Sequence, residues 1–194
     1  MGPPGFGSRR SARFERIHLG RPWCEALLLR DGRKLIARPI QPEDAGSLRR
    51  SFGELTSEEI RFRFLRPITE LTRAYARRLT QIDRRKAFAL ALVETLPPEE
   101  ARIGAVARTV IDESGRDAEF AIIVGREIGG CGLGRYLLVR IIEWSRKKGL
   151  NTVYGDVMIE NDRMLRLAKK SGFTFRIKPD DPQIVRIVRT LKTE

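Results

Sequence analysis

The chain has 194 residues, 41% of them apolar, and a formal net charge of +13, so it is long enough for one domain with a complete core. No stretch reaches the roughly 18 apolar residues of a membrane helix, which argues against a membrane-spanning protein. The single histidine, His18, excludes histidine-based triads and metal sites, and the two cysteines, Cys24 and Cys131, are too few for a disulfide framework or a zinc site. We therefore expect reduced thiols, no metal and a cytoplasmic protein.

The N-terminal residues 1–20 combine Gly, Pro, Ser and Arg and lack the apolar stretch of a secretory signal. We predict a flexible basic tail there and place the domain at residues 21–194. Two apolar runs follow over residues 23–40, on either side of Asp31 and Gly32. This pair commonly takes the positive φ angles of a tight turn, so the segment predicts a β-hairpin.

Three short helices are expected next. Pro42 with two following carboxylates is typical of a helix start, and the pattern runs to about Gly53. Thr56 and Glu59 have the spacing of a capping box before a second helix, and Thr72 can cap a third.

From Lys86 the pattern changes to a three-stranded antiparallel meander, in the segments AFALALVE, RIGAVARTVID and AEFAIIV. A helix, RYLLVRIIEWSRKKG, follows and ends at Gly149. The strand NTVYGDVMI, a helix capped by Asn161 and two closing strands around PDDP complete the chain.

A glycine-rich turn, GGCGLGR, joins the last meander strand to the following helix. Backbone N–H groups and the helix dipole make such a turn an anion site, and a pyrophosphate would fit. Gly129, Gly130, Gly132 and Gly134 permit positive φ and close approach, while Arg135 adds a cation. Glycine turns also simply connect strands to helices, so the turn alone leaves both interpretations open. A dinucleotide site fits less well, because the preceding strand ends an antiparallel meander.

Residues 23–192 resemble the GNAT superfamily of N-acetyltransferases, whose turn reads Gln/Arg-x-x-Gly-x-Gly/Ala and holds the coenzyme A pyrophosphate. The match lies at Gly129–Gly134, and VMIENDRMLRLAKKSGF is similar to the closing motif of the family. The segments IARPIQPEDAGSLRR, SEEIRFRFLRPITELT, LTQID and AEFAIIV look most like bacterial protein lysine acetyltransferases of the Pat type. The resemblance implies one α/β (α+β) domain with a mixed, mostly antiparallel sheet flanked by helices, and acetyl-CoA as co-substrate.

The same resemblance implies the site residues. Glu119 matches the base glutamate of the Pat-type enzymes, and the alternative is an exposed strand glutamate beside Arg108 or Arg116. Asp117 and Glu127 are weaker candidates for the base. The cofactor would be held by backbone groups near Ile122 and Val124, by the turn, and by an amide: Gly129, Gly130, Cys131, Gly132, Leu133, Gly134, Arg135 and Asn161. The cap position alone would also explain Asn161.

Two positions depart from the family pattern. Gly129 stands where Gln or Arg is usual, so one phosphate-facing side chain is missing. Ala168 stands where many members place a tyrosine that protonates the departing thiolate. We expect transfer without that acid, because a thiol with a pKa of about 8.5 leaves tolerably as thiolate. Family chemistry is direct transfer, so Cys131 is interpreted as incidental.

The preferred hypothesis is acetylation of a lysine on an acidic protein, since the basic charge suits such a target. A small-molecule amine acceptor and a non-catalytic acyl-CoA sensor are the alternatives. Nucleic acid fits poorly, because aromatic residues are only 7% of the chain and mostly look like core residues. The sequence leaves the acceptor and the choice between monomer and homodimer open.

Overall fold

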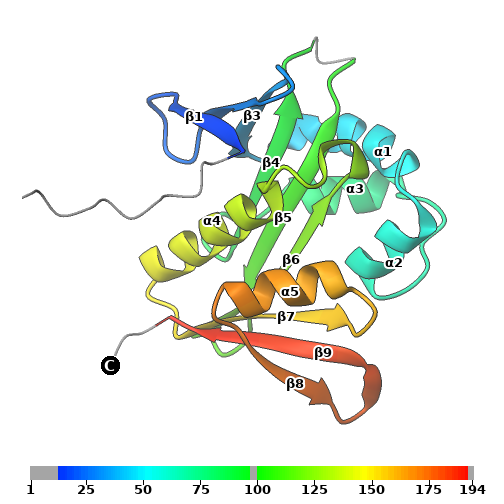
Figure 1. The fold of residues 1–194 in the computed structure, drawn as a ribbon, viewed down its shortest axis with the longest axis vertical. Coiled ribbons are helices and arrows are strands. Elements are labelled where there is room, and N and C mark those ends of the chain that lie inside the picture. The colour runs from blue at the N-terminus through cyan, green and yellow to red at the C-terminus, as the bar shows by residue number, and fades with distance from the viewer. Residues whose placement is uncertain (1–12, 97–99, 192–194) are drawn as a thin grey trace, which may run out of the picture.

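One mixed sheet of nine strands runs through the part of the chain that the structure describes, residues 13–96 and 100–191 of a computed structural model (Figure 1). Its order is β1-β2-β3-β4-β5-β6-β7-β9-β8. All neighbours are antiparallel except the pair β6 and β7. The strands are β1 (Phe14–His18), β2 (Glu25–Leu29), β3 (Lys34–Pro39), β4 (Ala87–Glu94), β5 (Ile103–Ile111), β6 (Asp117–Val124), β7 (Thr152–Met158), β8 (Thr174–Lys178) and β9 (Asp181–Thr190). The predicted mostly antiparallel mixed sheet is confirmed.

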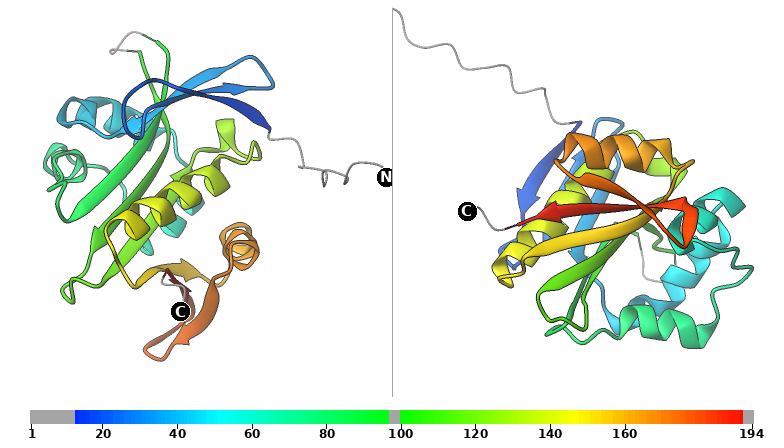
Figure 2. Two further views of the ribbon diagram at one scale, coloured as in Figure 1. Left: turned by 90° about the vertical axis from the view of Figure 1, so that its left-hand side faces the viewer. Right: turned by 90° about the horizontal axis from the view of Figure 1, so that it is seen from below.

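Helices cover both faces of this sheet (Figures 1 and 2). On one face lie α1 (Ala45–Gly53), preceded by a short 3₁₀ turn, α2 (Ser57–Phe64) and α3 (Arg73–Thr80). On the other lie α4 (Leu133–Lys147) and α5 (Asp162–Lys170). The main core lies between the sheet and α4, where Leu137, Leu138 and Ile141 are fully buried. The predicted helices are therefore confirmed, and none of the described helices is long and apolar enough to cross a membrane.

The predicted helix caps are confirmed as well. The Thr56 hydroxyl accepts a hydrogen bond from the Glu59 backbone N–H at 3.2 Å, while the Glu59 carboxylate accepts from the Thr56 N–H at 2.8 Å. Thr72 caps α3 in the same way through the Tyr75 N–H. These bonds satisfy amides that a helix start leaves without partners.

The β2–β3 hairpin has a different turn from the one expected. The Gly32 N–H donates to the Leu29 carbonyl at 3.1 Å, and the Leu29 N–H donates to the Arg33 carbonyl at 2.8 Å. The loop therefore has three residues, and only its last one, Gly32, has a positive φ of 87°. Asp31 instead accepts hydrogen bonds from Arg33.

The expected tail is wrong in its second half, because β1 pairs with β2 along its whole length. Residues 1–12 lie outside the described part of the chain. The Phe14 ring packs edge-on against Tyr136 of α4, with ring centroids 5.8 Å apart. The domain therefore begins before residue 21, and the predicted boundary has to move toward the N-terminus.

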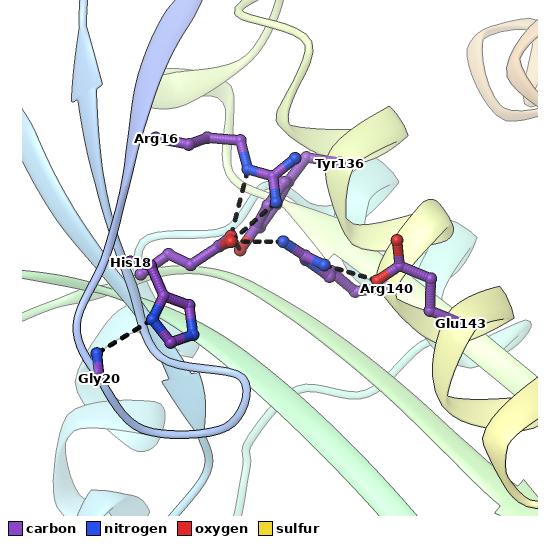
Figure 3. Close-up of polar contacts among 7 residues, drawn as sticks. Arg16, His18, Gly20, Tyr136, Arg140 and Glu143 are labelled. Carbon is purple, nitrogen blue, oxygen red and sulfur yellow. Dashed lines mark hydrogen bonds and ion pairs between the residues drawn. The ribbon is translucent and has the colours of Figure 1, made fainter.

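Glu25 of β2 joins β1 and β2 to α4 through Arg16, Tyr136 and Arg140, which Figure 3 labels. Its carboxylate accepts hydrogen bonds from Arg16 at 2.7 Å, Arg140 at 2.5 Å and the Tyr136 hydroxyl at 2.6 Å. Burial acts to raise the pKa of Glu25, but these hydrogen bonds outweigh it and lower the pKa to about 2. The Glu25 carboxylate of the folded protein is therefore charged at neutral pH.

Candidate functional site

The sheet forks between β6 and β7. These parallel strands pair only from Asp117 opposite Thr152 to Glu119 opposite Tyr154, and then separate. Gly155 stands at the branch point, where a Cβ atom would lie 2.9 Å from the Phe120 carbonyl oxygen. Such a contact is closer than real side chains allow, so glycine lets the two backbones approach before they diverge.

A cleft of about 820 Å³ opens at this fork. Its walls come from α2, β6, the glycine turn, the first turn of α4, β7 and α5. Most of the predicted cofactor residues line it: Ile122, Val124, Gly130, Gly132, Leu133, Gly134, Arg135 and Asn161. Gly129 and Cys131 do not. The Cys131 side chain packs against the core instead, with its Sγ 3.8 Å from the Gly129 carbonyl oxygen.

The backbone of β6 is directed into the cleft at the predicted positions. The Asp112 N–H donates to the Asp117 carbonyl, and the Gly125 N–H donates to the Gly104 carbonyl. These two bonds show that Asp117 and Gly125 face β5, and along an antiparallel pair every second residue does so. Ile122 and Val124 are residues in between, so their N–H and C=O groups point away from β5. Beyond the fork, that direction leads toward the space between β6 and β7.

Two glycines of the turn have the left-handed conformation, not all four. Gly130 has φ of 79° and Gly132 has φ of 84°, directly before α4. Gly129 has φ of −64°, and Gly134 lies within the first turn of α4. A Cβ at Gly134 would meet Leu167 at an ordinary 3.5 Å. The turn thus presents the N-terminus of a 15-residue helix to the cleft.

Two arginines stand at this anion site. Arg135 is exposed in the first turn of α4 and has no side-chain partner among the described residues. Arg163 of α5 also lines the cleft, and its guanidinium nitrogens lie 3.0 and 3.2 Å from the point where a Cβ of residue 129 would be. Sequence reasoning missed Arg163, because only the packing of α5 beside the turn brings it there. The Arg163 guanidinium thus lies where a side chain of residue 129 would begin.

Asn161 and the lead-in to β1 complete the surroundings. The Asn161 Oδ1 accepts from the Met164 N–H at 3.1 Å, which confirms its role as the cap of α5. Its amide nitrogen remains free to donate to a ligand, and Oδ1 keeps a second lone pair. On the other side, Arg13 donates a hydrogen bond to the Gly130 carbonyl. The segment expected to be a tail thus contacts the turn.

Glu119 lies at the last paired position of the fork, opposite Tyr154 on β7 and Val110 on β5. Its side chain is exposed and is not among the residues lining the cleft, although an apolar strand environment was expected. It is close enough to Arg63 that its negative charge acts to raise the pKa of that arginine. Arg186 is also within its electrostatic reach.

The weaker candidates for the base are placed differently. The Asp117 carboxylate accepts hydrogen bonds from the Thr152 N–H at 3.1 Å and the Thr152 hydroxyl at 2.8 Å, so it holds β7. Glu127 is exposed beside Arg126, 3.8 Å away. Ala168 is fully buried in the core, so no acid stands at that position.

A second cavity of about 590 Å³ lies on the face covered by α1–α3. Its apolar walls include Ile40, Phe52 and Leu71. It shares lining residues with the cleft: Glu59, Arg63, Ile123, Arg126 and Ile128. The two cavities therefore adjoin each other at α2 and the end of β6.

Known proteins share both the sequence pattern and the fold. The family model described as an acetyltransferase (GNAT) domain matches residues 34–174. The chain is similar to an acetyltransferase of Pseudomonas aeruginosa, 28% identical over 172 residues that cover 89% of this chain and 90% of the relative. The structure is similar to the GNAT domain of S. lividans PAT, with a TM-score of 0.76 and 25% identity over 90% of this chain and 100% of that one. An acetyltransferase of the GNAT family from Streptococcus pneumoniae shares the fold, with a TM-score of 0.63 and 20% identity over 81% and 99% of the two chains.

Proposed function

The chain belongs to the acetyltransferase (GNAT) domain family and is an acetyl-CoA-dependent N-acetyltransferase, and from this premise we propose that its acceptor is a protein lysine and that Glu119 is the general base. The observation that supports the proposal is the fork: β6 and β7 separate directly after Glu119, and the cleft beyond it is lined from Phe120 onward. The alternatives are a small-molecule amine acceptor and an acyl-CoA sensor without turnover.

The cleft fits the coenzyme. Bound acetyl-CoA carries the acetyl group as a reactive thioester. In the proposal, the N–H groups around Gly130 and Gly132 and the side chains of Arg135 and Arg163 bind the pyrophosphate, because amides at a helix start and guanidinium groups are strong phosphate donors. The backbone of Ile122 and Val124 binds the pantetheine arm as an added strand would be bound.

Glu119 takes the proton of the acceptor amine in this proposal. A lysine ammonium cannot attack until it loses a proton, and a carboxylate within reach, directly or through one water, can accept it. The exposed position of Glu119 beside the fork leaves room for such a water. Arg63 and Arg186 lie within electrostatic reach of Glu119.

A protein lysine is supported by two observations. The fold is similar to the GNAT domain of S. lividans PAT, and the charge of +13 complements an acidic surface. A single chain carrying the site is compatible with a monomer or a homodimer. The proposal places the protein in the cytoplasm, where the free thiols of Cys24 and Cys131 stay reduced.

The test is a thiol-release assay with acetyl-CoA and three acceptor classes: lysine-containing proteins, lysine peptides and polyamines. Protein or peptide acceptors should release thiol. Glu119→Gln should keep acetyl-CoA affinity and lower kcat by about 10²–10⁴-fold at neutral pH. The deficit should shrink as pH approaches the lysine pKa of about 10.4, because more free amine is then present. Turnover only with polyamines would reject the lysine acceptor, binding without turnover would indicate a sensor, and an undiminished kcat would reject Glu119.

A further inference from the structure

Arg63 of α2 and Arg108 of β5 are two half-buried cations in the wall of the second cavity. Arg63 lies over the Phe64 ring, 4.9 Å from its centroid, and Arg108 donates to the Leu79 carbonyl at 3.3 Å. Neither forms an ion pair with a carboxylate within the described residues. Arg63 lines the cleft as well, so it stands where the two cavities meet.

Other cations at the same cavity have acidic partners. Arg102 lies 3.4 Å from Glu54, and Arg126 lies 3.8 Å from Glu127. Glu59, the acidic residue shared with the cleft, already accepts from the Thr56 and Arg126 backbone N–H groups at 2.8 and 3.0 Å. The remaining positive charge of the cavity is therefore concentrated at Arg63 and Arg108.

This arrangement disfavours both charges in the free protein. Burial, with a smaller contribution from the charge of Arg108, lowers the pKa of Arg63 to about 10, while Tyr75 and Glu119 act in the opposite direction. Burial also lowers the pKa of Arg108, and the charge of Arg78 adds to that effect. An anion bound between two such guanidinium groups would be strongly favoured, because it compensates charges that have already lost part of their hydration.

We infer that Arg63 and Arg108 form a subsite that binds a carboxylate of the substrate. The inference rests on the proposed transfer function and adds a substrate class to it. A planar carboxylate matches the donor geometry of guanidinium, and the apolar walls of the cavity suit the aliphatic stem of an acidic side chain. The carboxylate comes either from an acidic residue beside the acceptor lysine or from a dicarboxylic acyl group on the donor thioester.

The first experiment measures acceptor binding without coenzyme. Fluorescence anisotropy compares two labelled peptides that differ only in Glu or Gln next to the lysine. For a carboxylate of the acceptor, the Glu peptide should bind roughly tenfold or more tightly, the size of one charge-assisted hydrogen bond. Arg63→Gln and Arg108→Gln should each remove most of this preference. Arg102→Gln, which removes a paired cation of the same cavity, should keep it.

The second experiment tests the donor. Calorimetry compares succinyl-CoA with butyryl-CoA, which have acyl chains of equal carbon number. For a carboxylate of the acyl group, the wild type should bind succinyl-CoA roughly tenfold or more tightly, and the two arginine variants should bind both equally. Thermal melting checks that the variants fold, and Arg63→Lys and Arg108→Lys, which keep the charge but lose the fork of donors, should retain an intermediate preference.

The peptide and thioester binding experiments test the carboxylate subsite independently of acetyl transfer. The inference is overturned when neither the Glu peptide nor succinyl-CoA is preferred, or when Arg102→Gln removes the preference as fully as the other variants. Thiol release from acetyl-CoA with the Gln peptide tests transfer itself. Its presence without any carboxylate preference would keep the proposed function and reject the subsite, and its absence beside a clear binding preference would do the reverse.

Discussion

Replacing Arg163 by alanine should weaken acetyl-CoA binding, although no sequence motif includes this residue. Its guanidinium nitrogens lie 3.0 and 3.2 Å from the position of an absent Cβ at Gly129, in the wall of the cleft. A charge-assisted contact to phosphate contributes about 1.5–3 kcal/mol. Because Arg163 is exposed, we reduce this to about 1–2 kcal/mol, which corresponds to roughly a 5–30-fold increase in Kd.

Isothermal titration calorimetry measures this change, with Lys169→Ala as the control. Lys169 is an exposed cation on the same helix that does not line the cleft, so its removal should leave Kd within about twofold. S-acetyl-pantetheine, which lacks the pyrophosphate, should bind the wild type and Arg163→Ala equally. An unchanged Kd for acetyl-CoA, or an equal loss with the short ligand, would refute the phosphate contact.

A second substitution moves the cation back to the turn. Gly129 has φ of −64°, which any residue adopts, so a side chain there is limited by its neighbours rather than by backbone strain. Gly129→Arg alone should bind acetyl-CoA less well than the wild type, because its Cβ would lie 3.0 Å from the Arg163 guanidinium and 3.1 Å from the Arg126 carbonyl oxygen. In the Arg163→Ala background the same change should recover affinity. A double variant that binds more weakly than Arg163→Ala would contradict this exchange of cations.

Three further outcomes are expected. Deleting residues 1–12 should leave the melting temperature unchanged. Deleting residues 1–20 also removes β1 with its contacts to Glu25 and Tyr136, and should lower the melting temperature by roughly 4–8 °C, for a loss of about 2 kcal/mol. Equal melting temperatures of the two deletion variants would show that β1 contributes nothing to stability. Glu25→Gln should reduce the free energy of unfolding at pH 7 by about 3 kcal/mol, given a folded pKa of about 2 against 4.5 unfolded. Because the folded pKa is depressed, this contribution is complete above about pH 4.5 and disappears as pH falls toward 2, so chemical unfolding across that window should show the two curves converging. Gly132→Val should abolish acetyl-CoA binding because φ is 84° there, while Gly134→Ala, inside α4, should keep the circular dichroism spectrum; normal binding by the valine variant would reject the turn as the phosphate site.

Local patterns predicted the elements whose stability is local. The capping box at Thr56 and Glu59 and the apolar face around Leu137 and Ile141 are short-range signals, and the structure has both. The positions of Ile122 and Val124 came instead from the resemblance to the family, and the register of β5 and β6 shows that their backbone groups lie on the free side of β6. Pattern reasoning works for the capping box and the apolar face because each signal lies within one element.

The features that were missed depend on contacts between distant segments. β1 is mostly exposed and short, so its sequence has no apolar pattern, and it is held by Arg16 and Phe14 reaching Glu25 and Tyr136. Arg163 lies 34 positions after Gly129 and meets it only because α5 packs beside the turn. Glu119 lies between buried Ala118 and Phe120 and is exposed on the other face of β6, and the end of the β6–β7 pairing beside it is set by contacts between strands far apart in the sequence.

The separation of β6 from β7 leaves a strand edge inside the protein rather than at its rim. An open edge normally invites pairing with another chain, and proteins protect edges against aggregation. Here α2, the glycine turn and α5 line the opening, so the free backbone of β6 faces a cleft of the same molecule. The amide hydrogens of Ile122 and Val124 should accordingly exchange with solvent in the free protein and become protected only when a ligand takes the place of the missing neighbour strand.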